Sequence, residues 1–185
     1  VAQQLHAPLD VLVVRKLGAP GHEELAMGAI ARDGVQVLNR EVIDNFGLAP
    51  GVIAEVAARE ERELARREKL YRGDQPPGVV KDKTVILVDD GIATGATVRA
   101  ALAILRQGGA GWVVVAAPVI AEDIHSDLCR EADEVVAMIV PREFQGVGAW
   151  YEDFTQTTDA EVQALLDPAA PPAAVRWGRP ANSAH

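Results

Sequence analysis

The chain has 185 residues, a length typical of one domain, and it is 49% hydrophobic and 24% charged, as is usual for a globular protein. Its net charge of −9 argues against a nucleic-acid partner, because nucleic acids are bound by basic surfaces. The one cysteine, Cys129, excludes an intramolecular disulfide and favours a cytoplasmic, reducing compartment. No apolar run approaches the roughly 18 residues of a membrane span, so no membrane partner is expected.

The first fourteen residues combine a helical segment with a short apolar run. Residues 1–9 are typical of the last turns of a helix, and the apolar run at residues 10–14 predicts a buried parallel strand. Arg15 and Lys16 come directly after this run. Two cations at the carboxyl end of a strand are candidates for binding a pyrophosphate, and the alternative is two solvated charges that begin a loop.

The next region predicts a hairpin and then a long helix. The apolar runs 26–31 and 35–38 flank an Asp-Gly pair, which is a good hairpin signal. His22, in the Gly/Pro-rich connection before them, is either an acid–base group in a closing loop or an exposed loop residue. Residues 50–72 predict a charged helix with proline in its first turn. The basic end of this helix is either solvated or faces the predicted pyrophosphate site.

The most informative stretch is residues 85–97. Four aliphatic residues, 85–88, predict a strand buried on both faces of a parallel sheet, and Asp89 and Asp90 follow at its carboxyl end. A turn of small and hydroxyl residues comes next, and then a helix with apolar residues at spacings of three and four. A strand, an acidic pair, a turn and a helix together form a site at the carboxyl edge of a sheet in α/β proteins.

The turn has the chemistry of a phosphate cradle. Gly95 allows a close approach of the backbone, and the amides at the start of the helix favour an anion. The residues that we expect to contact phosphate are Ala93, Thr94, Gly95, Ala96 and Thr97.

The acidic pair requires a different ligand, because carboxylates repel phosphate. Asp89 and Asp90 suit vicinal hydroxyls, the water shell of a metal ion or a developing cation. A phosphate next to a diol describes a ribose 5-phosphate. The alternative is a strand end with two solvated carboxylates and a helix cap at Thr94.

The rest of the chain predicts further β/α units. Residues 112–117 and 134–140 are expected to form strands around a helix at 122–131, and residues 159–166 a short helix. Together with residues 10–14 this gives four parallel strands joined by right-handed crossovers. The predicted fold is therefore α/β: a doubly wound, mostly parallel sheet with a small antiparallel flap.

Residues 85–97 resemble the PRPP-binding motif of the type I phosphoribosyltransferases, in which an apolar strand, two acidic residues and a Thr-Gly-containing phosphate loop follow one another. The resemblance implies transfer of phosphoribose from PRPP, with Mg²⁺, to or from a nitrogenous base, with pyrophosphate as co-product. Asp89 and Asp90 would hold the ribose hydroxyls beside the developing positive charge, and the loop would anchor the 5′-phosphate. Arg15 and Lys16 would receive the pyrophosphate. A homodimer is common in the family, and the metal ligands are not assigned.

The aromatic-rich residues 141–154 resemble the hood of hypoxanthine-type phosphoribosyltransferases. Phe144 matches the position that stacks on the base, and Asp153 loosely matches a later acidic residue; the alternative is that these rings pack a small lid. Ala93 occupies the place of the aspartate base of the 6-oxopurine enzymes, so that mechanism does not carry over. Orotate and uracil enzymes also lack this carboxylate.

The sequence also predicts the bounds of the domain and of a tail. No residues match the strand and pyrophosphate-binding loop that precede this region in the family, so we expect residues 1–166 to form a domain without its first strand. Residues 167–185 are expected to be a Pro/Ala-rich tail. The alternative function is a PRPP- or nucleotide-binding regulatory or accessory domain without turnover.

Overall fold

The computed structural model describes residues 1–74, 76 and 78–166, without the side chains of residues 23, 24 and 33. The predicted tail, residues 167–185, lies outside the described residues. The helices are α1 (Ala2–Leu5), α2 (Arg40–Asn45), α3 (Pro50–Arg72), α4 (Ala96–Gln107), α5 (Glu122–Glu131), α6 (Asp159–Leu166) and the 3₁₀ turns η1 (Arg32–Gly34) and η2 (Val147–Trp150). The strands are β1 (Val14–Ala19), β2 (His22–Ala31), β3 (Gln36–Leu38), β4 (Thr84–Val88), β5 (Trp112–Val119) and β6 (Glu134–Ile139).

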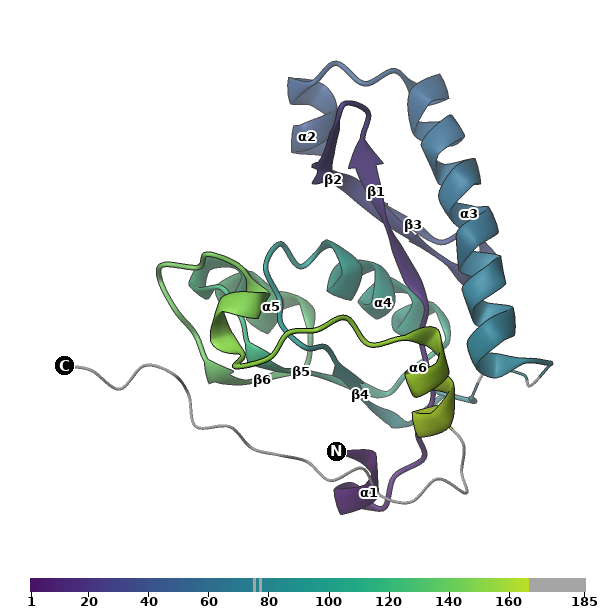
Figure 1. Cartoon of the computed structure of the whole chain (residues 1–185), viewed down its shortest axis with the longest axis vertical. Coiled ribbons are helices and arrows are strands. Elements are labelled where there is room, and N and C mark those ends of the chain that lie inside the picture. Colours follow the sequence, from purple (N-terminus) through teal and green to yellow (C-terminus); the bar gives the residue numbers. More distant parts are fainter. Residues whose placement is uncertain (75, 77, 167–185) are drawn as a thin grey trace.

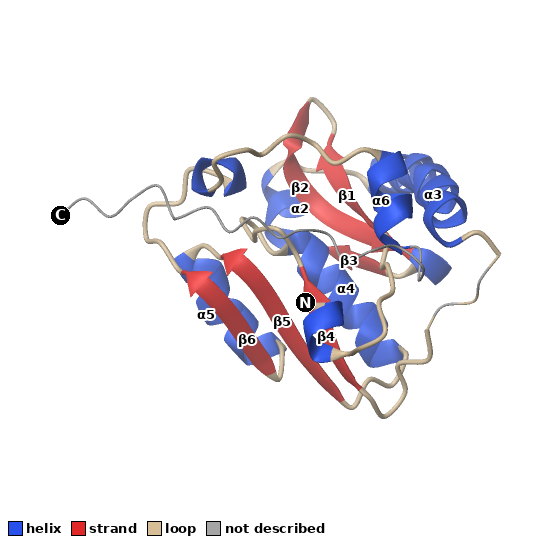
Figure 2. Cartoon of the chain, turned by 60° about the horizontal axis from the view of Figure 1, so that its bottom comes forward, coloured by secondary structure: helices blue, strands red, loops and turns tan. Residues whose placement is uncertain are grey.

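Two three-stranded sheets define the architecture. Strands β4, β5 and β6 form a parallel sheet in that order, and β1, β2 and β3 form an antiparallel sheet. Helix α4 contacts strands of both sheets and lies between them, while α3 flanks the antiparallel sheet (Figures 1 and 2). The predicted α/β class, with a parallel sheet and a small antiparallel flap, is confirmed.

One strand differs from the prediction. Residues 10–14 were expected to form a fourth parallel strand, but β1 begins only at Val14 and pairs antiparallel with β2. Gly21, with φ +76°, completes the tight turn that folds the chain back, and Lys16 then lies opposite Ala29. A backbone with positive φ is easily adopted by glycine, so the sequence permits the tight turn that brings β2 beside β1. The described parallel sheet therefore has three strands.

The core next to the predicted site is aliphatic. Val113, Val115 and Val119 of β5 are fully buried, and the first two pack in one cluster with the buried Leu102 of α4 and Leu128 of α5. The apolar positions predicted for the helix after residue 95 are all buried, as their spacing required: Val98, Ala101, Leu102 and Leu105. This packing fixes the start of α4 against the carboxyl end of β4.

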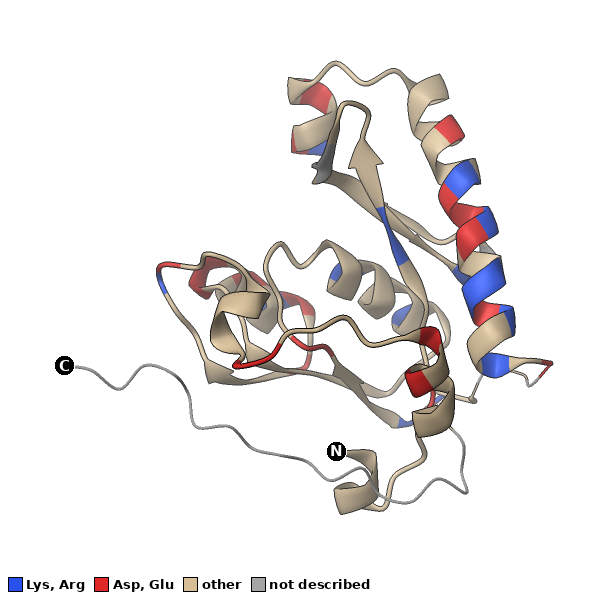
Figure 3. Cartoon of the chain, in the orientation of Figure 1, with Lys and Arg blue, Asp and Glu red and all other residues tan. Residues whose placement is uncertain are grey.

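The other predicted helices and the hairpin are also present. Helices α3, α5 and α6 have the predicted bounds, and β2 pairs with β3 across η1. Charges of both signs alternate along α3, where Glu63 binds Arg66 and Arg67 (Figure 3). None of the described helices has the length and apolar character needed to cross a membrane.

Candidate active site

The phosphate-loop prediction corresponds to a small cavity at the carboxyl end of β4. The cavity has a volume of about 160 Å³ and is lined by Asp89 and residues 91–98. Gly95 is buried, has φ +71° and precedes the first turn of α4, where its carbonyl accepts from the Arg99 N–H at 2.8 Å. The five predicted phosphate contacts, Ala93, Thr94, Gly95, Ala96 and Thr97, all line this cavity. The loop thus lies at a helix N-terminus, where amide groups and the helix dipole favour an anion.

The two aspartates lie in different environments. Asp89 is half-buried and lines the cavity, whereas Asp90 is exposed and does not line it. Burial raises the pKa of Asp89 from 3.8 to about 6, opposed by the Asp90 N–H that donates to its carboxylate at 2.9 Å. The neighbouring Asp90 carboxylate adds to the increase. A carboxyl group with a perturbed pKa in a cavity is typical of functional sites.

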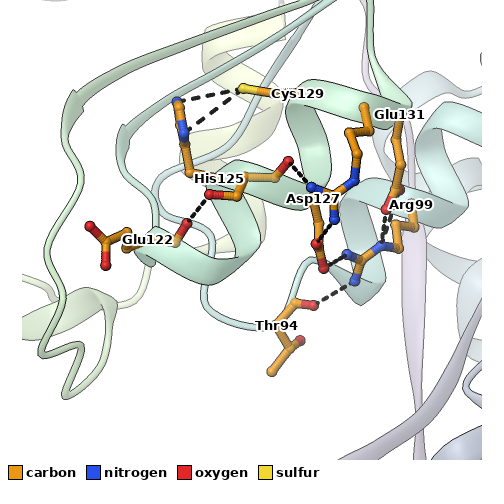
Figure 4. A network of polar contacts seen from close by, with 9 residues as sticks. Thr94, Arg99, Glu122, His125, Asp127, Cys129 and Glu131 are labelled. Atoms are coloured by element: carbon orange, nitrogen blue, oxygen red, sulfur yellow. Dashed lines mark hydrogen bonds and ion pairs between the residues drawn. The ribbon is translucent and has the colours of Figure 1, made fainter.

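A polar network anchors the predicted phosphate loop to α5 (Figure 4). Arg99, in the second turn of α4, donates from Nη1 to the Thr94 carbonyl at 3.0 Å. Its Nε donates to Glu131 at 2.9 Å, and its Nη2 donates to Asp127 at 3.2 Å. Arg99 was not predicted from the sequence. An arginine four residues after the loop glycine is a weak signal, because arginine is also common on solvated helix faces.

The predicted hood lies against the acidic turn. The Tyr151 hydroxyl donates to the Asp90 carbonyl at 2.5 Å, and the ring of Tyr151 lies 5.2 Å from that of Phe154. A Cβ atom on Gly91 would lie 2.5 Å from Val147 Cγ1, so Gly91 is required for this close approach. Burial raises the pKa of Tyr151, and the carboxylates of the acidic pair add to the increase. The sequence indicated an aromatic hood, but not that Tyr151 reaches the acidic pair.

The other predicted hood residues have no contact with the cavity. Phe144 is half-buried in the loop after β6 and does not line the cavity. Asp153 accepts from the backbone N–H of Thr155 at 2.9 Å, so its carboxylate stabilises its own turn. The base-stacking role of Phe144 therefore stays a prediction.

The two predicted pyrophosphate cations lie within β1, rather than after a parallel strand, and neither lines the cavity. Arg15 donates two hydrogen bonds to Glu60 of α3, at 2.7 and 3.0 Å, and Glu60 is 9% exposed. Lys16 is exposed. A half-buried ion pair orients the Arg15 guanidinium toward α3, because the side chain of Glu60 would be costly to leave unpaired. The apolar run before Arg15 favoured a parallel strand, so the ion pair between Arg15 and Glu60 was not expected.

His22 was expected in a loop, but it lies in a strand, where it is exposed. It begins β2, beside the hairpin turn, and its ring contacts that of Phe46 edge-on with centroids 5.3 Å apart. This contact tethers the hairpin to the loop after α2.

The chain belongs to the phosphoribosyl transferase family, because the family described as "Phosphoribosyl transferase domain" matches residues 1–149. This match agrees with the loop, the acidic pair and the α/β fold described above.

Individual relatives give the same result. The chain is 46% identical over 167 residues to a protein of Mycobacterium tuberculosis with a provisional name as a phosphoribosyl transferase; the match covers 90% of this chain and 38% of the relative. It is 35% identical over 121 residues to the "Bifunctional protein PyrR" of Clostridioides difficile, covering 62% of this chain and 67% of that protein. The chain thus spans less than half the length of the mycobacterial relative.

A solved structure is also similar. The protein TT1426 from Thermus thermophilus aligns with a TM-score of 0.72 and 42% identity, covering 89% of this chain and 78% of that chain. The fold described here is therefore shared with a crystal structure.

Proposed function

We propose that this domain binds PRPP and transfers its phosphoribose group to, or accepts it from, a nitrogenous base, with pyrophosphate as co-product. The observation that carries the proposal is the shared cavity of Asp89 and the phosphate loop. A ribose 5-phosphate needs an anion site and a hydroxyl-binding carboxylate a few ångströms apart. The loop supplies the first group, and Asp89 supplies the second.

Each residue has a role that follows from its charge and position. The amides at the start of α4 and the hydroxyls of Thr94 and Thr97 bind the 5′-phosphate. Asp89, whose pKa of about 6 leaves it mainly ionised at pH 7, accepts hydrogen bonds from the ribose hydroxyls. Its negative charge also stabilises positive charge that develops at the ribose ring as the bond to pyrophosphate breaks. Catalysis then depends on positioning and electrostatics, without a covalent enzyme intermediate.

Mg²⁺ is the cation that suits this site. Within the described part of the chain, no three His, Cys, Asp or Glu residues come together as a metal site. Mg²⁺ commonly uses one or two carboxylates, water molecules and substrate phosphates, so a complete protein cage is not needed. Asp89 and Asp90 are the carboxylates that would hold it beside the substrate, where it would neutralise phosphate charge.

The base would lie on the side of the hood. Residues 141–154 follow β6, and Tyr151 connects this segment to the acidic turn. Phe144 is the ring proposed to stack on the base. The absence of a carboxylate at Ala93 argues against a base that must lose a proton to the loop, as in the 6-oxopurine enzymes.

A regulatory domain that binds PRPP or a nucleotide is the second candidate, and one observation favours it. The ion pair with Glu60 engages Arg15, which reduces the positive charge available for a pyrophosphate. A domain that binds ribose phosphate without releasing pyrophosphate needs no such cation.

The experiment that tests the proposal is calorimetric titration of PRPP with Mg²⁺ into the full-length protein. We expect micromolar binding in the wild type and at least a roughly hundredfold loss in the Asp89→Asn/Asp90→Asn double variant, because two charged contacts are removed. Glu41→Gln/Asp44→Asn is the matched control, since it removes two exposed carboxylates from α2.

The outcomes separate the candidates. Binding followed by release of pyrophosphate in the presence of a base supports the enzyme. Binding without release across a panel of purine and pyrimidine bases supports the regulatory domain. Equal binding by the wild type and the double variant overturns the assignment of the site.

A further inference from the structure

The orientation of one peptide group in the phosphate loop is controlled from outside the cavity. Arg99 Nη1 donates to the Thr94 carbonyl at 3.0 Å. The chain has no cis peptide bond among its described residues, so the peptide that joins Thr94 to Gly95 is trans. In a trans peptide the C=O and N–H groups point in opposite directions. The bond from Arg99 therefore turns the Gly95 N–H away from the guanidinium.

Arg99 itself is not placed to bind the phosphate. The described residues that line the cavity end at Val98 in this turn, and Arg99 is not among them. A Cβ atom on Gly95 would lie 3.2 Å from Arg99 Nη1 and 3.1 Å from Ile124 Cγ2. The guanidinium thus lies behind the loop, against α5.

Two carboxylates of α5 fix the guanidinium in this position. Glu131 accepts from Nε with both oxygens, at 2.9 and 3.0 Å, and Asp127 accepts from Nη2 at 3.2 Å. The two acidic residues also neutralise the charge of Arg99, which weakens any long-range attraction for phosphate. Figure 4 shows Arg99 between Thr94 and the two carboxylates. The three acceptors use the planar fork of an arginine, which a lysine cannot reproduce.

We propose that Arg99 is a positioning residue that holds the Thr94 carbonyl outward and thereby aims the Gly95 N–H into the phosphate site. Asp127 and Glu131 make α5 part of this arrangement, although α5 contributes no group to the cavity. The proposal rests on the proposed function, because it assigns Arg99 to the binding of the 5′-phosphate. It predicts that the hydrogen-bonding fork of Arg99, rather than its charge, determines the affinity.

The experiment compares four variants of the full-length protein with the wild type by titration of ribose 5-phosphate. Arg99→Gln and Arg99→Lys are both expected to bind about tenfold more weakly, since one oriented amide contact to a charged ligand is lost. Glu131→Gln leaves two acceptors on the guanidinium and should have a smaller effect. Arg130→Gln is the charge-matched control, because Arg130 binds Asp127 but does not contact the loop.

A second measurement determines the orientation of the peptide group between Thr94 and Gly95 in the ligand-free protein. The residual dipolar coupling of the Gly95 N–H reports the orientation of that bond. It is expected to change in Arg99→Gln and in Arg99→Lys, while the couplings of β5 stay as in the wild type. A purely structural role of Arg99 would lower the unfolding temperature without this local change.

Failure of the positioning role of Arg99 can be distinguished from failure of the proposed function. If the wild type does not bind ribose 5-phosphate, the proposed function fails, and the dipolar coupling still decides whether Arg99 orients the peptide. Wild-type affinity in Arg99→Lys would show that charge is sufficient and would overturn the positioning role. An unchanged Gly95 coupling in Arg99→Gln would overturn it as well.

Discussion

Replacing Asp89 by asparagine should make the folded protein more stable at neutral pH. Burial is the main reason that the pKa of Asp89 lies at about 6 instead of 3.8. A difference of about 2 pKa units corresponds to roughly 3 kcal/mol of unfavourable free energy for the ionised form. Since the side chain is half-buried and partly screened by water, we expect a gain of about 1–3 kcal/mol in Asp89→Asn.

The dependence on pH has a definite sign. The pKa is higher in the folded state, so the folded protein binds this proton more tightly than the unfolded chain does. The cost of the charge is therefore absent below pH 3.8, increases between pH 3.8 and about 6, and stays constant above that. The advantage of Asp89→Asn should follow the same course, because an amide does not titrate.

Urea unfolding at about pH 4 and near pH 7.5 measures this dependence of stability on pH. We expect similar stability for the wild type and Asp89→Asn at the lower pH, and the full difference at the higher pH. Asp44→Asn, an exposed position on α2, is the control and should show no such gain. A variant Asp89→Asn that is less stable than the wild type near pH 7.5, or whose advantage does not depend on pH, would show that the buried charge of Asp89 does not destabilise the folded protein.

Two further substitutions test the loop and the hood. Gly95→Val should weaken the binding of ribose 5-phosphate by tenfold or more and cost about 1–2 kcal/mol of stability, because the left-handed backbone at φ +71° strains a branched residue. Gly47→Val, at φ +57° and with open space around it, has the backbone strain without the close side-chain contacts, so it should lose less stability and bind like the wild type. Weak binding by both variants would contradict the role of the loop. Tyr151→Phe removes one hydrogen bond, worth about 1 kcal/mol, and should weaken PRPP binding about fivefold in a calorimetric titration. Tyr71→Phe is the control and should bind like the wild type. Equal affinities of Tyr151→Phe and the wild type would show that the hood does not contribute to PRPP binding.

Local sequence patterns predicted the elements that form the candidate site. The aliphatic run at 85–88 became β4, although this strand is not buried on both faces as predicted, because Ile86 and Val88 are exposed. The apolar spacing after Gly95 became the buried face of α4. Asp89 and the loop residues were predicted to share a site because a strand, its acidic end and a glycine-containing turn are adjacent in the chain. For such a site the geometry is largely determined within about a dozen residues.

Contacts between distant residues were not predicted. Arg15 was expected to face a pyrophosphate, and its partner Glu60 is 45 residues away on α3. Tyr151 and the Asp90 carbonyl are 61 residues apart, and Arg99 and Glu131 are 32 apart. No periodicity or local motif encodes such pairs.

Local sequence patterns were sufficient to predict the α/β class, the bounds of α3, α5 and α6, and the loop from Asp89 to Thr97, since each depends on local spacing and on the conformational freedom of glycine. Tertiary packing was needed to show that β1 folds back on β2 and that Arg15 is paired with α3. It also decided that Asp89, rather than Asp90, lines the cavity. These features depend on which surfaces are buried against one another, and burial is a property of the packed chain.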